Sequence, residues 1–185
     1  RAHSPEPLLL IVDESSHTDR VHLLRVSLAY RGGSLPLTWA VWPQNQALEP
    51  GAYGAWLAQV LAEVATLLPA GVAVIVLADR AYGVPSFIDQ VASHGWHWIV
   101  RVTTTGSLRV VDRHGVEHEL ATLLAERLPV PGRRWRTRGR LFKGAGWRVA
   151  GVLADWAAGQ REPLVVLTDL PPRWGVLDTY DQRFW

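Results

Sequence analysis

Short runs of apolar residues without polar alternation mark three places along this chain of 185 residues. They are Val72–Leu77, which is rich in valine and isoleucine, Leu8–Val12 and Leu164–Leu167. Runs of this length predict strands that are buried on both faces. An aspartate follows the first two runs closely, as Asp79 and Asp13. The pattern therefore predicts two buried strands that each present a carboxylate at their end.

Segments with other periodicities connect these runs. Val21–Tyr30 and Leu35–Trp42 alternate as strands do, and short turns join them into an antiparallel meander with Leu8–Val12. Apolar residues at helical spacing predict an amphipathic helix over Trp56–Leu68. A helix that leads directly into a buried strand is a crossover connection, so Val72–Leu77 should run parallel to Leu8–Val12. Asp13 and Asp79 would then meet at one edge of the sheet.

The second half of the chain begins with a helix that Pro85 opens and with a strand over Trp96–Val102. From residue 103 to residue 161 the sequence changes to short β-prone pieces and turns, which one helix-like stretch, Leu120–Leu128, interrupts. We interpret residues 103–161 as a mainly β insertion, followed by the strand Leu164–Leu167 and by a helix that starts near Val176. The fold class is α/β, with a mixed sheet and flanking helices.

Each aspartate has two interpretations. Aspartate at a strand end commonly caps the following turn by accepting backbone N–H bonds. A pair of carboxylates at one sheet edge is also a usual way to hold a divalent cation. The chain contains no cysteine, so any metal must be held by oxygen or imidazole ligands, which favours a hard cation.

Basic residues are unevenly placed, although the net charge is only +2. The segment 133–148 contains no acidic residue and carries Arg133, Arg134, Arg136, Arg138, Arg140, Lys143 and Arg148. Arginine matches phosphate in a bidentate manner, and two tryptophans lie within the segment, so it predicts a surface that binds nucleic acid. The alternative is a solvated β-hairpin whose arginines point outward.

The composition is that of a globular chain, and no apolar run is long enough to span a membrane. We expect no membrane partner and a cytosolic location. The sequence has no methionine, and it ends on two large apolar residues, Phe184 and Trp185. We therefore expect a fragment of a longer reading frame.

The order of these elements resembles the catalytic domain of bacterial insertion-sequence transposases of the DDE class, in particular the group that includes the fourth insertion-sequence family. The resemblance covers nearly the whole chain. It is carried by LLLIVDES around Asp13, SLAYRGGSLPLTWAVW from Ser27, VIVLADRAYGVPSFID from Val74, WHWIVRV from Trp96, and LVVLTDLP with the ending TYDQRFW. The ADRAYG stretch and the Tyr180-x-x-Arg183 ending are the specific parts.

This resemblance implies a ribonuclease-H-like core over residues 1–185 in which Asp13 and Asp79 are catalytic and bind Mg²⁺ or Mn²⁺. It further implies that Arg80, Tyr180 and Arg183 contact DNA, in addition to the contacts predicted for the arginine-rich segment. The implied partner is double-stranded DNA, at the transposon ends and at the target. The protein is then expected to act as a homodimer in the bacterial cytosol or nucleoid. The third carboxylate of the family, a glutamate, would be the second residue after Trp185, so this fragment alone should be inactive. Glu14 departs from the family, which has a small residue there.

The predicted function is metal-dependent DNA cleavage and strand transfer. A transposase remnant that binds DNA or a partner without catalysis is the main alternative. A nucleotide-binding α/β protein is disfavoured because no glycine-rich phosphate loop follows either strand. We expect His94 and His97 to be structural, Asp169 to cap a turn, and tryptophans such as Trp39, Trp96 and Trp98 to lie mostly in the core.

Overall fold

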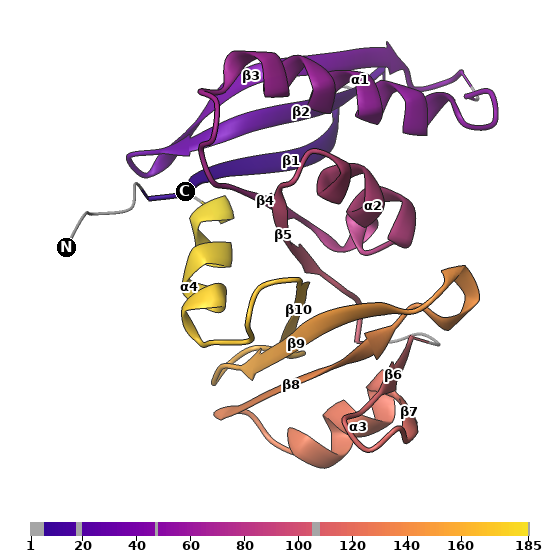
Figure 1. Ribbon diagram of the computed structural model, residues 1–185, viewed down its shortest axis with the longest axis vertical. Coiled ribbons are helices and arrows are strands. Elements are labelled where there is room, and N and C mark those ends of the chain that lie inside the picture. The colour runs from indigo at the N-terminus through magenta and orange to yellow at the C-terminus, as the bar shows by residue number, and fades with distance from the viewer. Residues whose placement is uncertain (1–5, 18–19, 47, 105–107, 185) are drawn as a thin grey trace.

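Ten strands form one sheet in the computed structural model, which describes residues 6–17, 20–46, 48–104 and 108–184 (Figure 1). The strand order is β3-β2-β1-β4-β5-β10-β9-β8-β6-β7. The strands are β1 (Leu8–His17), β2 (Val21–Tyr30), β3 (Gly33–Pro43), β4 (Val74–Ala78), β5 (His97–Arg101), β6 (Arg109–Val111), β7 (Glu117–Glu119), β8 (Arg133–Leu141), β9 (Arg148–Trp156) and β10 (Leu164–Thr168). The helices are α1 (Ala52–Leu67), α2 (Pro85–Ser93), α3 (Leu120–Arg127) and α4 (Gly175–Asp181), with the short 3₁₀ helices η1 (Arg80–Tyr82), η2 (Lys143–Ala145) and η3 (Gln182–Phe184).

The first half of the chain has the predicted topology. Strands β1, β2 and β3 form an antiparallel meander. Helix α1 then crosses over to β4, which pairs with β1 in parallel from Leu8 opposite Val74 to Val12 opposite Ala78. Strand β5 extends the parallel part next to β4. The predicted parallel pairing of the two aspartate-bearing strands is therefore confirmed.

The second half continues the same sheet with antiparallel strands. Strand β10 pairs with β5 and β9, and β9 pairs with β8. The segment 103–161 supplies β6 to β9 and α3, so it is rich in strands as predicted, and its status as an insertion stays a prediction; residues 105–107 lie outside the described part of the chain. Because β8 and β9 are hydrogen-bonded into the ladder through β10, this segment lengthens the sheet.

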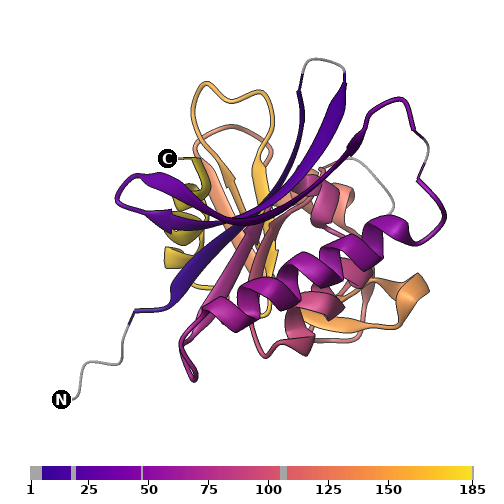
Figure 2. The same ribbon diagram turned by 90° about the horizontal axis from the view of Figure 1, so that it is seen from above.

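Helices cover both faces of the sheet (Figure 2). Helices α1 and α2 lie on one face, and with buried leucines of α3 they form the larger hydrophobic cluster, which we call the first cluster. Helix α4 lies on the other face. There Val176, Leu177 and Tyr180 pack on Ile11, Leu77 and other strand residues in the second cluster.

Three sequence predictions differ from the structure. Strand β1 does not end at Asp13 but continues to His17, because β2 pairs with it along this extension. Helix α1 begins at Ala52, four residues before the predicted start. Trp39 is wrongly assigned to the core, since 60% of its surface is exposed. Trp96 and Trp98 are buried as predicted, and the end of the predicted C-terminal helix, Trp185, lies outside the described residues.

Candidate active site

Asp13 and Asp79 lie side by side where the parallel strands β1 and β4 stop pairing, at the carboxyl end of β4. We call this end of the sheet the site edge. The last parallel pair of β1 and β4 is Val12 opposite Ala78, and each aspartate is the next residue in its strand direction. Side chains alternate between faces along a strand, so Asp13 lies on the face of Ile11 and Asp79 on that of Leu77. Both of these residues belong to the second cluster, so the two carboxylates share the face that α4 covers.

We call the side chains of Asp13 and Asp79 the carboxylate pair. Arg183 of η3 lies between them. One terminal nitrogen of its guanidinium lies 2.6 Å from Oδ1 of Asp13 and 3.7 Å from Oδ2 of Asp79. These two oxygens are therefore separated by no more than the sum of the two distances, about 6.3 Å. The Arg183 side chain is only 12% exposed, whereas the side chains of Asp13 and Asp79 are 31% and 38% exposed, so solvent reaches the carboxylates from the side away from the guanidinium.

Helix α4 positions Arg183 by packing against the sheet. Leu177 and Tyr180 are buried in the second cluster, and Tyr180 is completely inaccessible to solvent. Burial raises the pKa of Tyr180, and its hydroxyl has no hydrogen-bond partner among the described residues. A direct contact between Tyr180 and DNA stays a prediction, and it would require α4 to move. In the described conformation Tyr180 anchors the helix that delivers Arg183.

The ADRAYG stretch holds Asp79 in place. Oδ1 of Asp79 accepts a hydrogen bond of 2.9 Å from the N–H of Ala81 and so caps η1, which leaves Oδ2 facing Arg183. The hydroxyl of Tyr53 in α1 donates to that of buried Tyr82 at 2.9 Å, and burial raises the pKa of both tyrosines. A Cβ atom at Gly83 would lie 2.8 Å from a methyl group of Val102, so only glycine fits where this turn approaches the end of β5. The turn-capping and site interpretations of Asp79 are thus compatible.

Glu14 points away from the carboxylate pair. As the next residue along β1 it lies on the opposite face from Asp13. Its Oε1 atom lies 3.2 Å from Nδ1 of His22 on β2, and that imidazole stacks on Trp42. The departure from the family pattern at this position therefore leaves the face of Asp13 and Asp79 unchanged.

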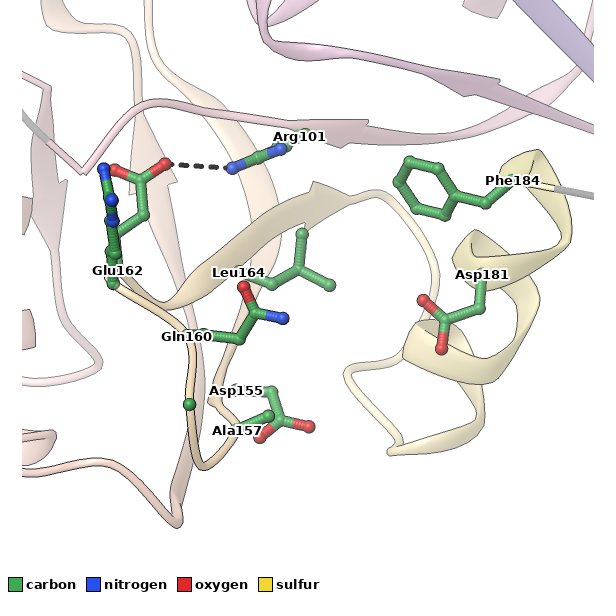
Figure 3. Close-up of a pocket in the computed structure, with 10 residues that line it drawn as sticks. Arg101, Asp155, Ala157, Gln160, Glu162, Leu164, Asp181 and Phe184 are labelled. Carbon is green, nitrogen blue, oxygen red and sulfur yellow. Dashed lines mark hydrogen bonds and ion pairs between the residues drawn. The ribbon is translucent and has the colours of Figure 1, made fainter.

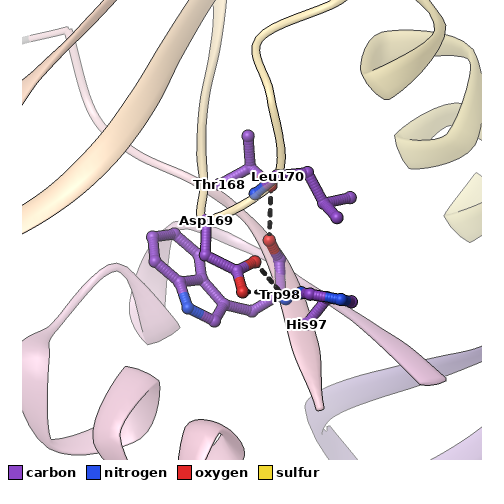
Figure 4. A network of polar contacts seen from close by, with 5 residues as sticks. All are labelled: His97, Trp98, Thr168, Asp169 and Leu170. Atoms are coloured by element: carbon purple, nitrogen blue, oxygen red, sulfur yellow. Dashed lines mark hydrogen bonds and ion pairs between the residues drawn. The ribbon is translucent and has the colours of Figure 1, made fainter. Parts of the chain in front are cut away.

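Asp169 also follows a buried strand, but it lies at the opposite edge of the sheet, which we call the far edge. Strand β10 runs antiparallel to β5, so its end meets the start of β5. There Asp169 accepts a hydrogen bond of 3.0 Å from the N–H of Trp98 and lies 2.7 Å from Nδ1 of His97 (Figure 4). The hydroxyl of Thr168 donates to the carbonyl of Trp98 at 2.7 Å. These contacts agree with structural roles for Asp169 and His97, although Asp169 caps β5 instead of its own turn.

Four arginines of β8 form a row along one face of the sheet, which we call the arginine row: Arg134, Arg136, Arg138 and Arg140. All four are exposed, while Trp135 and Leu141 on the alternate positions face the first cluster. The guanidiniums of Arg134 and Arg136 lie 5.8 and 4.9 Å from the ring of Trp174, which precedes α4, and Arg134 pairs with Asp155 at 2.8 Å. The arginine row is therefore on the same face as α4 and the carboxylate pair.

A cleft of about 930 Å³ opens on this face between the end of α4 and the strands β5, β9 and β10 (Figure 3). Its walls carry charges of both signs, including Arg101, which pairs with Glu162 at 3.0 Å, and Asp155 and Asp181. Burial, with the charges of Asp178 and Asp155, raises the pKa of Asp181. Neither Asp13 nor Asp79 lines this cleft. Arg80 is exposed and lines a smaller cleft of about 340 Å³ with Arg109 and Lys143.

Comparison with known proteins decides the family. A family model described as "Transposase DDE domain" matches residues 12–146, which is well over half of the chain and includes both aspartates. The chain belongs to the transposase DDE domain family. The prediction of a DDE-class transposase domain is thus confirmed, and the family implies a transposase class of enzyme.

Other comparisons add little to this DDE domain. A search of curated proteins found no match. Among solved structures, the chain is similar to Aquifex aeolicus Argonaute, with 11% identity and a TM-score of 0.41. That match covers 98% of this chain but only 25% of the Argonaute chain, and a likeness this weak supports no conclusion about fold or function.

The carboxylate pair of this DDE domain has a geometry that suits a metal site. The guanidinium of Arg183 is a positive charge held between two carboxylates, so the pair already accommodates a cation. Divalent cations such as Mg²⁺ prefer carboxylate oxygens, so Asp13 and Asp79 are the residues that would hold one here. No group of three or more possible metal ligands occurs within the described residues.

Among the described residues, no helix is long and apolar enough to cross a membrane.

Proposed function

We propose that this DDE domain catalyses metal-dependent phosphoryl transfer on DNA, in the cleavage and strand-transfer steps of transposition. The observation that supports this most directly is the register of β1 and β4, which brings Asp13 and Asp79 together on one face, with a cation between them. The strand order β3-β2-β1-β4-β5, antiparallel and then parallel, is compatible with a ribonuclease-H-like core.

Asp13 and Asp79 would hold Mg²⁺ or Mn²⁺ through their carboxylate oxygens, with further ligands supplied by water and a DNA phosphate. A divalent cation held there would supply activation of the attacking water or 3′-hydroxyl and stabilisation of the leaving oxygen in an in-line displacement. The rigid sheet fixes the separation of the carboxylates, and the cap at Ala81 orients Asp79. Arg183 would leave the pair when a metal binds and could then contact a phosphate, for which its guanidinium is suited.

The DNA partner would lie across the face that carries α4. Arg80, near the site edge, and the arginine row would neutralise backbone phosphates, and such contacts position a duplex without reading its sequence. This substrate implies that the protein works where the bacterial chromosome is, in the cytosol or nucleoid, and pairing of two transposon ends would use a homodimer. Residues 103–161 would serve as the DNA-binding insertion of the domain.

Direct metal binding tests the proposal on the chain as it stands. Titration with Mn²⁺, followed by the electron paramagnetic resonance signal of free Mn²⁺, should show binding that falls at least tenfold in Asp13→Asn and in Asp79→Asn. Asp169→Asn is the matched control, because it changes the same residue type at the far edge. Mn²⁺ binding that is absent, or that is indifferent to Asp13 and Asp79, would refute catalysis and favour a DNA-binding remnant.

A further inference from the structure

Arg25 and Trp39 continue a row of side chains that starts at Asp13. In the antiparallel pairing of β1 with β2, Asp13 lies directly opposite Arg25, and in that of β2 with β3, Arg25 lies opposite Trp39. Directly opposed residues of antiparallel strands share one face of a sheet. Asp13, Arg25 and Trp39 therefore lie side by side on the face of the carboxylate pair.

This part of the face is open. Helix α1 covers the opposite face, where Thr38 donates a hydrogen bond of 2.6 Å to Glu63 of α1 and Trp42 packs against Trp56. Trp39 is 60% exposed, and the adjacent Val41 is exposed on the same face. Within the described residues, the side chains of Arg25 and Trp39 take part in no hydrogen bond, ion pair or ring contact. The exposed indole of Trp39 and the partly exposed side chain of Arg25 therefore lie beside the site without a protein partner among the described residues.

This combination of residues is suited to a DNA strand. Exposed aromatic rings bind unpaired nucleotides by stacking, whatever their sequence, and arginine neutralises the phosphate backbone. Neighbouring strands are about 4.8 Å apart, so Trp39 lies roughly 10 Å from Asp13, or about three nucleotide steps of 3.4 Å. The row is therefore close enough for one strand to contact Asp13, Arg25 and Trp39 together.

We propose that Arg25 and Trp39 bind the DNA strand next to the scissile phosphate, with Arg25 on a phosphate and Trp39 stacked on an unpaired nucleotide about three positions away. The proposal rests on the function proposed above, since it takes Asp13 as the position of the reacting phosphate. A strand that runs along this row must be locally unpaired for the indole to reach a base. The site would therefore favour a frayed or single-stranded flank over intact duplex.

A second copy of this chain is a less suitable occupant. Strand β3 is at the edge of the sheet, and Trp39 with Val41 would supply apolar contacts to a partner. However, Arg25 lies in the same row and forms no ion pair among the described residues, so a protein interface there would bury its charge unless the second copy supplied a partner. DNA supplies such a partner, because its phosphates neutralise arginine.

Fluorescence anisotropy with labelled oligonucleotides tests the proposal. The probes are a blunt duplex and the same duplex with a five-nucleotide single-stranded flank, both in Ca²⁺ so that no cleavage occurs. Trp39→Ala should weaken binding of the flanked duplex about five- to hundredfold, Trp39→Phe should restore most of it, and the blunt duplex should change less. Arg25→Gln should weaken binding and lower its salt dependence. The control is Tyr30→Ala, an equally exposed aromatic outside the row.

Two results would overturn the proposal. One is equal affinity of wild type and Trp39→Ala for the flanked duplex. The other is a dimer that Trp39→Ala dissociates in sedimentation velocity while DNA affinity stays unchanged, which would assign the patch to a second copy. Mn²⁺ binding separates this inference from the proposed function, because the uncharged Trp39 variants should bind Mn²⁺ as wild type does. If only the DNA effect is missing, the inference fails and the proposed function stands.

Discussion

The two edges of this sheet carry aspartates with nearly the same sequence signature and very different surroundings. At the site edge, Asp13 and Asp79 lie together and face the guanidinium of Arg183. At the far edge, Asp169 binds the backbone and side chain at the start of β5. The difference arises from strand direction, because β10 is antiparallel to β5 whereas β4 is parallel to β1. An apolar run followed by aspartate therefore indicates a site only once the direction of its strand is known.

The largest expected effect concerns the arginine row, which lies on the same face of the sheet as the carboxylate pair. Replacing Arg136, Arg138 and Arg140 together by glutamine should weaken duplex binding at least tenfold. It should also reduce the slope of log affinity against log salt by about 0.9 for each phosphate that the protein no longer neutralises. Anisotropy titrations at several salt concentrations measure both quantities. Arg127→Gln, an exposed arginine at the end of α3 on the other face, is the control. An unchanged salt slope would mean that the arginine row is only a solvated strand face.

At the far edge, Asp169→Ala should lower the free energy of unfolding by about 1–3 kcal/mol, since the N–H of Trp98 loses its acceptor. Asp169→Asn retains an acceptor and should lower it less. Urea denaturation measures both variants, and Mn²⁺ binding should be unaffected by either. Loss of Mn²⁺ binding in a folded Asp169 variant would remove the distinction between the two edges.

Arg183→Gln tests whether the guanidinium competes with metal at the site edge. Because the guanidinium lies 2.6 Å from Asp13, it must withdraw before a cation can bind, and its removal should raise Mn²⁺ affinity about threefold to tenfold. Arg101→Gln, which removes an arginine paired with Glu162 elsewhere on the same face, should leave Mn²⁺ affinity unchanged. Weaker binding in Arg183→Gln would mean that this arginine orders the carboxylates for the metal.

The smallest effect is expected at Asp181, at the end of the helix that holds Arg183. Its pKa is raised by burial and by nearby Asp178 and Asp155, so the folded state retains this proton to higher pH than the unfolded chain. Stability is then lost as pH rises through the unfolded and then the folded pKa. Because Asp181 is largely exposed and solvent screens its charge, Asp181→Asn should stabilise the protein only slightly at pH 7, and not at acidic pH. Thermal melts of wild type and Asp181→Asn from acidic pH to pH 7 measure this difference in stability. An equal effect of the substitution at acidic pH and at pH 7 would contradict the prediction.

The sequence was sufficient for the parts of the fold that depend on local pattern. Buried runs, alternation and helical spacing gave the strands and helices of the first half, and the crossover gave the parallel pairing of β1 and β4. The direction of β10 could not be predicted in this way, because an apolar run carries no information on strand direction. Trp39 was wrongly predicted to lie in the core. Strand β3 is the edge strand of the sheet, and none of the described residues covers Trp39 there, which the sequence around it does not reveal.

The candidate site was predicted only in part for the same reason. Asp13 and Asp79 could be chosen because each follows a buried run. The contact of Arg183 with Asp13 joins residues 170 positions apart, and it depends on how α4 packs on the sheet. The row from Asp13 to Trp39 depends on the register of two strand pairs, in one of which a bulge between Val26 and Ser27 shifts the pairing. The catalytic and DNA-binding roles of these residues stay predictions.

The unbroken hydrogen-bonded ladder from β1 to β8 fixes the distance between the carboxylate pair and the arginine row. Five strand spacings of about 4.8 Å separate β1 from β8, so the arginine row is held roughly 24 Å from Asp13, the length of about seven base pairs. A duplex anchored on β8 would then be cut at a fixed number of base pairs from its anchor. Removing or adding one strand in between would move the cut by one to two base pairs without touching either site.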